Sequence, residues 1–456
     1  MGRQFRLAVV AMCLLPALRA QTPLLISRIT VIDATGRAAQ PGLSVLIRNG
    51  RIEQIGPAGQ MRPPRGARVV DAHGKFLIPG LWDMHTHLAG VAADPAWSRD
   101  ALLPLLLAAG ITGVRDMGGD LEALISWRRD IDAGKLRGPW IVASGPMLIA
   151  RGKATPDQLP VTNAAEARAA VRDLQHRGAD FIKIIDMPSR DAFFALADEC
   201  RKAGIAFAGH VPAVVTAGEA SDAGMRSIEH GVYSNLAFDV SSRGEELRKG
   251  TATSAQRMLD AVESFSPQRA NALAEALLRN HTWFVPTLFS VSIQPATDIV
   301  SADPLLNFIP YALRKQWAIG DQGAAATRQW WAKQYAADLR LTSVLHKAGV
   351  PILAGSDSLD RFVFPGSSLH EELFQLTKAG FTPMEALQAA TRDAARFLGR
   401  EAETGTIVSG ARADLVVLDA NPLDDIRNTA RVRAVVLKGE WLDRPVLDAM
   451  LARARQ

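Results

Sequence analysis

The sequence of 456 residues has few cysteines, few tyrosines and little excess charge, and each shortage excludes a class of protein. Its two cysteines are Cys13 and Cys200, so a framework of disulfide bonds cannot hold this fold together. We expect Cys200 to pack as a small apolar side chain rather than to act as a nucleophile. A chain of this length has enough apolar residues to bury a large core without cross-links.

The sequence also lacks a concentrated basic region and, beyond its first residues, a long hydrophobic run. The net charge is +5, but without Arg3, Arg6 and Arg19 near the amino terminus it is only +2. No basic stripe remains, so a nucleic-acid partner is not expected. No later apolar run reaches the roughly 18 residues that a membrane-spanning helix requires. We therefore expect no membrane span.

Residues 1–20 have the pattern of a secretory signal peptide. Arg3 and Arg6 give a charged start, and the apolar stretch Leu7–Leu18 is too short to span a bilayer. Ala20 is a small residue suited to the position before a cleavage site. We expect an exported protein, periplasmic or secreted, whose mature chain begins near Gln21. The alternative is an ordinary buried amino-terminal segment.

The remaining chain divides into two β-rich ends and a long middle in which strands and helices alternate. Residues 21–79 and 403–456 are predicted to form one composite β-sandwich domain, and residues 80–402 a (β/α)8 barrel of the TIM type. A doubly wound sheet is the alternative, but no glycine-rich phosphate loop follows the first strand of the middle. The eight predicted strands are Gly80–His87, Ile111–Met117, Trp140–Gly145, Phe181–Asp186, Ile205–Val211, Ser227–Gly231, Trp283–Leu288 and Pro351–Asp357.

One interval within the predicted barrel is longer than a single strand-to-strand crossover requires. It runs from Ser290 to about Ala336 and contains Trp317, Trp330 and Trp331. We interpret it as an insertion near the functional site.

Chemically active side chains stand at the ends of five predicted strands. His85 and His87 are two residues apart, so a strand directs both imidazoles to the same side. Lys183 lies between isoleucines in a strand predicted to be buried, where an unpaired ammonium is costly. Imidazole and carboxylate groups are ligands of zinc and similar divalent ions. The full set is His85, His87, Lys183, His210, His230 and Asp357.

This constellation resembles the amidohydrolase superfamily, in which the same residue types end the same strands. The flanking sequences resemble its imidazolonepropionase-like and prolidase-like branch over nearly the whole chain after residue 20. The segments that carry the resemblance are "LIPGLWDMHTHLAG", "GITGVRDMGG", "IEHGVYSN", "VPTL", "LAGSDS", "GFTPMEALQAATRDAARFLG" and "GARADLVVLDANPLDDI".

The resemblance implies two divalent metal ions, with zinc as the expected metal, and a lysine carboxylated by CO₂. It assigns His85, His87 and Asp357 to the more buried ion, His210 and His230 to the second, and carboxylated Lys183 as the bridge. A hydroxide shared by the two ions would be the nucleophile, because metals lower the pKa of bound water to about 7. Asp357 would then accept its proton and pass it to the leaving amine.

The resemblance therefore predicts an exported binuclear hydrolase of amide or peptide bonds. Its expected substrates are small molecules such as dipeptides or N-acyl amino acids, as for a carboxypeptidase or prolidase. Deaminases and true imidazolonepropionases of the superfamily usually carry a glutamate where this chain has Ala213, and they lack the bridging lysine. A mononuclear deaminase or cyclic-amide hydrolase and a non-catalytic binding protein on the same barrel are the two alternatives.

Three smaller expectations complete the analysis. Tyr233 follows His230 by three residues and, by resemblance, would bind a substrate carboxylate; local packing is the alternative. Arg115 and Asp116 are expected to form a structural ion pair at the rim. A homo-oligomer is compatible with the sequence. The other histidines, which we expect at the surface or in packing roles, are His73, His176, His281, His346 and His370.

Overall fold

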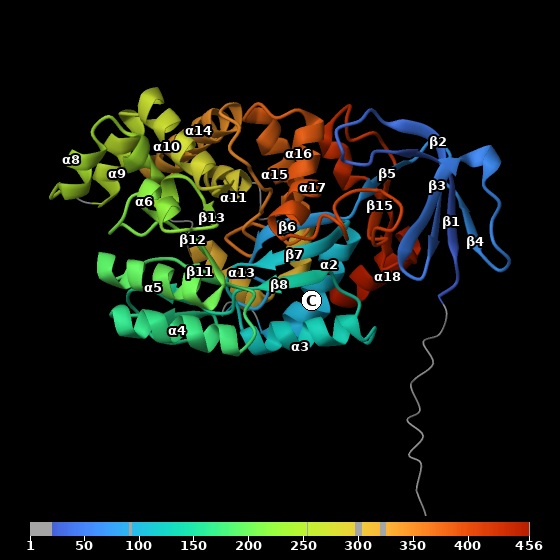
Figure 1. Ribbon diagram of the computed structural model, residues 1–456, viewed down its shortest axis with the longest axis horizontal. Coiled ribbons are helices and arrows are strands. Elements are labelled where there is room, and N and C mark those ends of the chain that lie inside the picture. The colour runs from blue at the N-terminus through green and yellow to red at the C-terminus, as the bar shows by residue number, and fades with distance from the viewer. Residues whose placement is uncertain (1–20, 91–93, 253, 297–302, 320–324, 456) are drawn as a thin grey trace, which may run out of the picture.

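The computed structural model of the chain describes residues 21–90, 94–252, 254–296, 303–319 and 325–455. The predicted signal peptide, residues 1–20, lies outside these residues. Figure 1 shows a β-sheet at one end of the molecule and a larger body of strands and helices beside it. None of the helices in the described ranges combines the length and the apolar character needed to cross a membrane.

The sheet at the end of the molecule contains strands from both ends of the chain. Its order is β17 (Glu440–Asp443), β16 (Val432–Leu437), β15 (Leu415–Leu418), β5 (Phe76–Pro79), β1 (Leu24–Val31), β2 (Gln40–Arg48) and β3 (Arg51–Pro57), with β4 (Arg68–Asp71) paired to β1. The two halves meet where β15 runs antiparallel to β5, with Val416 opposite Ile78. The sequence patterns of strand and turn at the two ends of the chain thus belong to one structure.

This sheet is a single hydrogen-bonded unit, whereas the sequence predicted a sandwich of two. Apolar side chains from its amino-terminal strands, such as Ile26 and Val45, share one buried cluster with Val417 and Val436 from its carboxyl-terminal strands. The sheet therefore curls around its own core instead of packing against a separate second sheet. The pairing of β15 with β5 makes this possible, because it joins the two halves edge to edge.

The larger body contains two parallel sheets. The first consists of β6 (Leu81–Thr86), β7 (Ile111–Asp116) and β8 (Trp140–Ala143). The second has the order β10 (Gln158–Pro160), β9 (Met147–Ile149), β11 (Phe181–Ile184), β12 (Ala206–Gly209), β13 (Ser227–Glu229) and β14 (Trp283–Val285). Seven of the eight predicted strands are present, and most end one to three residues earlier than predicted.

The eighth predicted strand, Pro351–Asp357, does not form a regular strand, so the sheets do not close into one continuous barrel. The segment still bridges the gap: Leu353 N–H donates to Phe284 O in β14, and Asp357 N–H donates to His85 O in β6, at 2.9 and 2.8 Å. Ser356 is bound by a side chain instead, because both its N–H and its hydroxyl donate to Asp83. On the other side, Asp180, which directly precedes β11, donates from its N–H to Ala143 O and accepts from Ala143 N–H through Oδ2, both at 2.8 Å.

Helices connect and cover these strands. Their starts are set by capping residues: the Asn163 side chain accepts from the Glu166 N–H at 2.9 Å, and Thr216 and Thr382 form capping boxes. In Figure 1 the helices α3, α4 and α5 lie together along one side of the strands, and α14 to α17 lie along the other. The longer helices are α3 (Leu121–Asp132), α4 (Ala164–His176), α5 (Arg190–Ala203), α9 (Ser254–Glu263), α10 (Pro267–Arg279), α14 (Ala325–Lys347), α15 (Ser367–Lys378) and α18 (Arg444–Ala454).

Shorter helices fill the connections, including the predicted insertion. They are α1 (Pro95–Trp97), α2 (Leu103–Ala108), α6 (Ala217–Asp222), α7 (Leu236–Val240), α8 (Gly244–Lys249), α11 (Leu288–Ser292), α13 (Tyr311–Ile319), α16 (Pro383–Ala389) and α17 (Arg392–Phe397). The insertion corresponds to α11, α13 and the first half of α14. Trp317 is buried against Phe362 and Phe364.

Candidate active site

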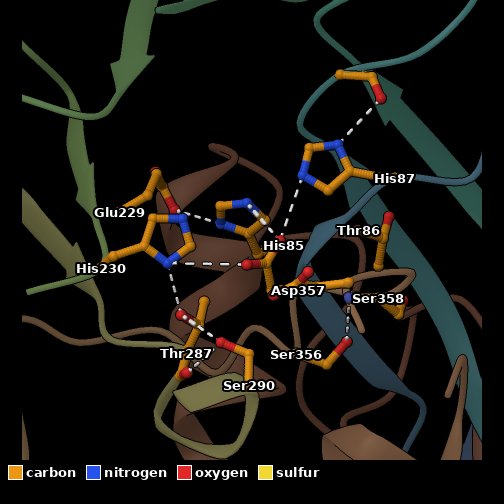
Figure 2. A network of polar contacts seen from close by, with 12 residues as sticks. His85, Thr86, His87, Glu229, His230, Thr287, Ser290, Ser356, Asp357 and Ser358 are labelled. Carbon is orange, nitrogen blue, oxygen red and sulfur yellow. Dashed lines mark hydrogen bonds and ion pairs between the residues drawn. The ribbon is translucent and has the colours of Figure 1, made fainter. Parts of the chain in front are cut away.

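The predicted residues converge where the strands of the larger body end. Figure 2 shows His85, His87 and His230 directed toward Asp357. Asp357 Oδ1 lies 3.4 Å from His85 Nε2 and 3.3 Å from His87 Nε2, and Asp357 Oδ2 lies 3.9 Å from His230 Nδ1. Residues far apart in the sequence thus share one carboxylate.

The remaining predicted residues complete the same cluster. The ring centroids of His210 and His230 lie 4.8 Å apart, as do those of His85 and His230. His210 and His230 stand just beyond the ends of β12 and β13, whereas Lys183 lies within β11. Lys183, His210, His230 and Asp357 line one cavity. The structure therefore brings all six predicted residues together.

The hydrogen bonds of His85 determine which of its ring nitrogens faces the cluster. Its Nδ1 lies 3.1 Å from Glu229 Oε2, and because a carboxylate only accepts, Nδ1 carries the proton. Nε2 is then left with a lone pair, and within the part of the chain that the structure describes it has no hydrogen-bond partner. Burial also holds the pKa of His85 well below its usual value, so the ring is neutral.

This protonation state leaves two acceptors facing each other. The lone pair on His85 Nε2 and the Asp357 carboxylate are 3.4 Å apart with no proton available between them. His87 has the same orientation, because its Nδ1 lies 3.1 Å from the carbonyl oxygen of Gly118 and its Nε2 points to Asp357. Donor atoms of His85, His230 and Asp357 all lie within 4.8 Å of one another, as ligands of one cation would. The electrostatics of the site call for a positive ion.

Lys183 presents a second unsatisfied group. Its side chain is fully buried, and its Nζ has no hydrogen-bond partner among the described residues. Burial lowers its pKa to about 8. An amine in this position is costly unless a ligand or a modification gives it a partner.

Asp357 is held as a carboxylate by its neighbours. Burial by itself would raise its pKa, but His230 and His87 hold that pKa at about 2. The residue also has positive φ, at 63°, which ends the extended segment and turns the side chain toward the imidazoles. Asp357 is therefore charged and well placed for binding a cation or accepting a proton.

A buried ion pair between Arg115 and Glu229 adjoins the cluster, because Glu229 also contacts His85. The Arg115 guanidinium donates from Nη2 to both oxygens of Glu229 at 2.9 Å, and both side chains are almost fully buried. The prediction that Arg115 pairs with Asp116 was wrong. Asp116 instead accepts from the backbone N–H groups of Leu88 and Gly118, so it orders the loop that follows β6.

Sequence reasoning missed several supporting residues. Glu229 stands directly before His230 in "SIEHG", and its position in a short buried strand was the only available signal. The Thr287 hydroxyl lies 2.7 Å from His230 Nδ1, and its own backbone is left-handed, with φ of 47°. Asp83 holds Ser356 and so positions the segment that carries Asp357.

A cavity of about 630 Å³ opens over the cluster. Tyr233 lies at its edge with 62% of its surface exposed, and its ring meets those of His210 and His230 edge to face. Residues of the predicted insertion also line the cavity, which confirms that the insertion lies near the site. The cavity residues outside the cluster are Gly90, Met147, Asp157, Ile185, Tyr233, Ser290, Val291, Gln294, Thr327, Trp331, Gln334, Leu359, Asp360 and Arg361.

Two of the histidines predicted to have packing or surface roles, His370 and His346, make contacts outside the cluster. His370 is buried between the carbonyl of Ala109 and the hydroxyl of Thr429, at 3.0 and 2.9 Å. His346 stacks on Phe381 with 3.7 Å between ring centroids. Cys200 is a buried free cysteine, and burial raises its pKa to about 12, so it has no nucleophilic character.

Comparison with known proteins identifies relatives of this chain. Residues 336–442 match the Amidohydrolase family. The chain is 36% identical to ochratoxinase from Aspergillus niger over 122 residues. This match covers 24% of ochratoxinase and 26% of this chain. It is 25% identical to the imidazolonepropionase of Sphingopyxis alaskensis over 403 residues, which cover 82% of this chain and 86% of that protein.

Solved structures agree with this relationship. A candidate prolidase from Bifidobacterium longum superimposes with a TM-score of 0.70 and 26% sequence identity, covering 95% of this chain and 99% of that one. The structural likeness therefore also covers residues before 336 and after 442. The family match does not reach these residues.

The buried pair of Arg115 and Glu229 generates a prediction about stability. Glu229→Gln keeps the shape of the side chain but leaves the Arg115 charge buried and uncompensated. We expect a loss of about 3–5 kcal/mol in the free energy of unfolding, measured by urea denaturation. Glu122→Gln is the matched control, because Glu122 pairs with Arg177 at 2.7 Å on the exposed surface and should cost at most about 1 kcal/mol. Equal losses in both variants would contradict this account.

Proposed function

Because the chain belongs to the amidohydrolase superfamily, in its imidazolonepropionase-like and prolidase-like branch, we propose that it is a metal-dependent hydrolase of amide bonds. The observation that carries the proposal is the pair of acceptors formed by His85 Nε2 and Asp357 Oδ1, which face each other at 3.4 Å in a buried site. Such a pair is repulsive unless a cation lies between the two atoms.

We propose that this donor set holds two divalent metal ions. His85, His87 and Asp357 would hold one, and His210 and His230 the other, with Lys183 between them. Neutral imidazoles and a carboxylate are the ligands that zinc prefers. Glu229 and Gly118 would fix the outward-facing nitrogens of His85 and His87, as outer partners of metal-bound histidines do. Thr287 instead bonds Nδ1 of His230, the nitrogen that lies nearer to Asp357.

Carboxylation of Lys183 would satisfy its buried amine. The ammonium group would first lose one proton to solvent, and the neutral Nζ would attack the carbon of CO₂. An N–C bond forms as one C–O π bond opens, and a second proton leaves to solvent, so a cationic ammonium becomes an anionic carbamate. The carbamate oxygens are then available as ligands on both sides. This modification would explain why a buried lysine stands among imidazoles without a hydrogen-bond partner.

Asp357 would move the proton during hydrolysis. Divalent metals in the site would polarise the scissile carbonyl and lower the pKa of the attacking water. Asp357 is a carboxylate at neutral pH, so it can accept a proton from that water as the C–O bond forms. It can then deliver the proton to the nitrogen as the C–N bond breaks, which leaves a carboxylic acid and an amine. The second proton of the water passes from the acid to the amine, so the products at neutral pH are a carboxylate and an ammonium ion.

We propose dipeptides or N-acyl amino acids as substrates. The cavity is large enough for a small molecule of this size, and Tyr233 at its edge is placed to contact a substrate carboxylate. Ochratoxinase and the candidate prolidase are the relatives that motivate the amide class. Position 213 carries alanine and position 183 lysine, which favours a binuclear amide hydrolase over a mononuclear deaminase or cyclic-amide hydrolase.

Lys183→Ala tests the binuclear centre. The variant should lose most bound metal and nearly all amide hydrolysis, because the bridging ligand is gone. Metal per chain, measured by plasma mass spectrometry, should be about two in the wild type, and ¹³C-bicarbonate should give a carbamate NMR signal that the variant lacks. Added short carboxylates should restore part of the activity. Lys202→Ala removes an exposed lysine and is the control. Wild-type metal content in Lys183→Ala would refute the bridge.

Asp357→Asn tests the proton shuttle and separates an enzyme from a binding protein. The amide keeps the shape and one oxygen ligand but cannot accept a proton, so metal should be partly retained. The turnover number kcat should fall by at least about 10²-fold, the low end of what general acid–base catalysis contributes. Metal content is measured on the same preparation as kcat. A variant that binds two metals and hydrolyses at the wild-type rate would overturn the mechanism.

We also propose that the protein is exported, on the pattern of residues 1–20. Removal of these residues would leave a chain that begins at Gln21, just before β1. Amino-terminal sequencing of protein from the native host should begin near Gln21, and fractionation should find it outside the cytoplasm. Native protein that retains residues 1–20 would contradict the proposal.

A further inference from the structure

One face of helix α14 forms a wall of the cavity. Thr327, Trp331 and Gln334 line the cavity, and Asp338 continues the same face one turn further. Their spacing of four, three and four residues places them on one side of a helix. This helix belongs to the insertion, so it is not among the strand ends that carry the imidazoles and Lys183.

Asp338 holds this wall at a defined position over the cluster. Its Oδ1 accepts from the Val232 N–H at 2.6 Å, and the side chain is almost fully buried. The approach is so close that a Cβ on Gly231 would lie 2.1 Å from Asp338 Oδ1. Because Gly231 and Val232 separate His230 from Tyr233, the wall and the loop that carries both residues are fastened together.

Apolar side chains line the cavity together with the polar Thr327 and Gln334 of α14. Met147, Ile185, Val291 and Leu359 line the same cavity as Trp331, and they come from four different segments. An indole in a cavity that also contains aliphatic side chains and a methionine provides apolar surface for a flat group. The volume of about 630 Å³ also exceeds what the backbone of a small dipeptide needs.

We infer that this wall selects amide substrates that carry an aromatic side chain, with Trp331 as the specificity-determining residue. The inference rests on the proposed function for its chemistry, but not for the binding preference itself. The aromatic group packs against Trp331 while the amide lies toward Asp357. The insertion thus sets which substrates bind, and the strand ends set what happens to them.

Hydrolysis of Ala-Phe, Phe-Ala and Ala-Ala by metal-loaded protein tests the inference. For the wild type, kcat/KM should be at least about tenfold higher for one of the aromatic dipeptides than for Ala-Ala. Trp331→Ala should remove this preference, mainly through KM, and change kcat/KM for Ala-Ala by less than about threefold. Trp331→Phe should keep most of the preference for the aromatic dipeptide, because a phenyl ring still offers a flat apolar surface. Trp330→Phe is the control, since Trp330 packs beside Val232 and Phe238 instead of lining the cavity.

A binding measurement separates the failure of this inference from the failure of the proposed function. Calorimetric titration with 3-phenylpropionate and propionate, which contain no amide, should give at least about tenfold tighter binding of the aromatic acid to the wild type. Trp331→Ala should bind both acids alike. If no dipeptide is hydrolysed but this preference appears, the proposed reaction fails and the aromatic site stands. Equal binding of the two acids by the wild type, or a uniform loss for every dipeptide in Trp331→Ala, overturns the inference.

Discussion

The rest of the site depends on one electrostatic constraint, the crowding of acceptor atoms around Asp357. His85 and His87 both direct Nε2 toward the same carboxylate oxygen, at 3.4 and 3.3 Å. The proton of His85 lies on the opposite nitrogen, because Glu229 can only accept. Burial alone would lower the pKa of His87, but its hydrogen bond to Asp357 raises that pKa. A cation in the centre would make the facing acceptor atoms of His85 and Asp357 favourable, and the buried Nζ of Lys183 lacks a hydrogen-bond partner among the described residues.

The scaffold around the cluster serves to keep these groups in position. The buried Arg115–Glu229 pair fixes the tautomer of His85, and Thr287 bonds His230. The Asp83 carboxylate accepts hydrogen bonds from the N–H and the hydroxyl of Ser356 and so fixes the segment that carries Asp357. These bonds replace the regular sheet pairing that a complete eighth strand would have made. The departure from a regular barrel therefore occurs where Asp357 must turn inward.

The chemistry and the selection of substrate are separated in the structure. The imidazoles and Lys183 lie on strands or just after them and Asp357 ends an extended segment, whereas α14 contributes another part of the cavity lining. The link between Asp338 and the Val232 N–H joins the two parts. An insertion can change the shape of the cavity without moving the reactive groups, which is how related barrels act on different substrates.

The sequence by itself determined the alternation of strands and helices, the position of each reactive residue at a strand end, and the convergence of His85 and His87. These are local properties, because a strand has a period of two and parallel strands end at one edge. Only the tertiary structure decided that Arg115 pairs with Glu229 rather than with the adjacent Asp116, that the segment before Asp357 is not a strand, and that Trp331 faces the cavity. Each of these depends on contacts between residues far apart in the chain, and periodicity carries no information about which distant partner a side chain will meet.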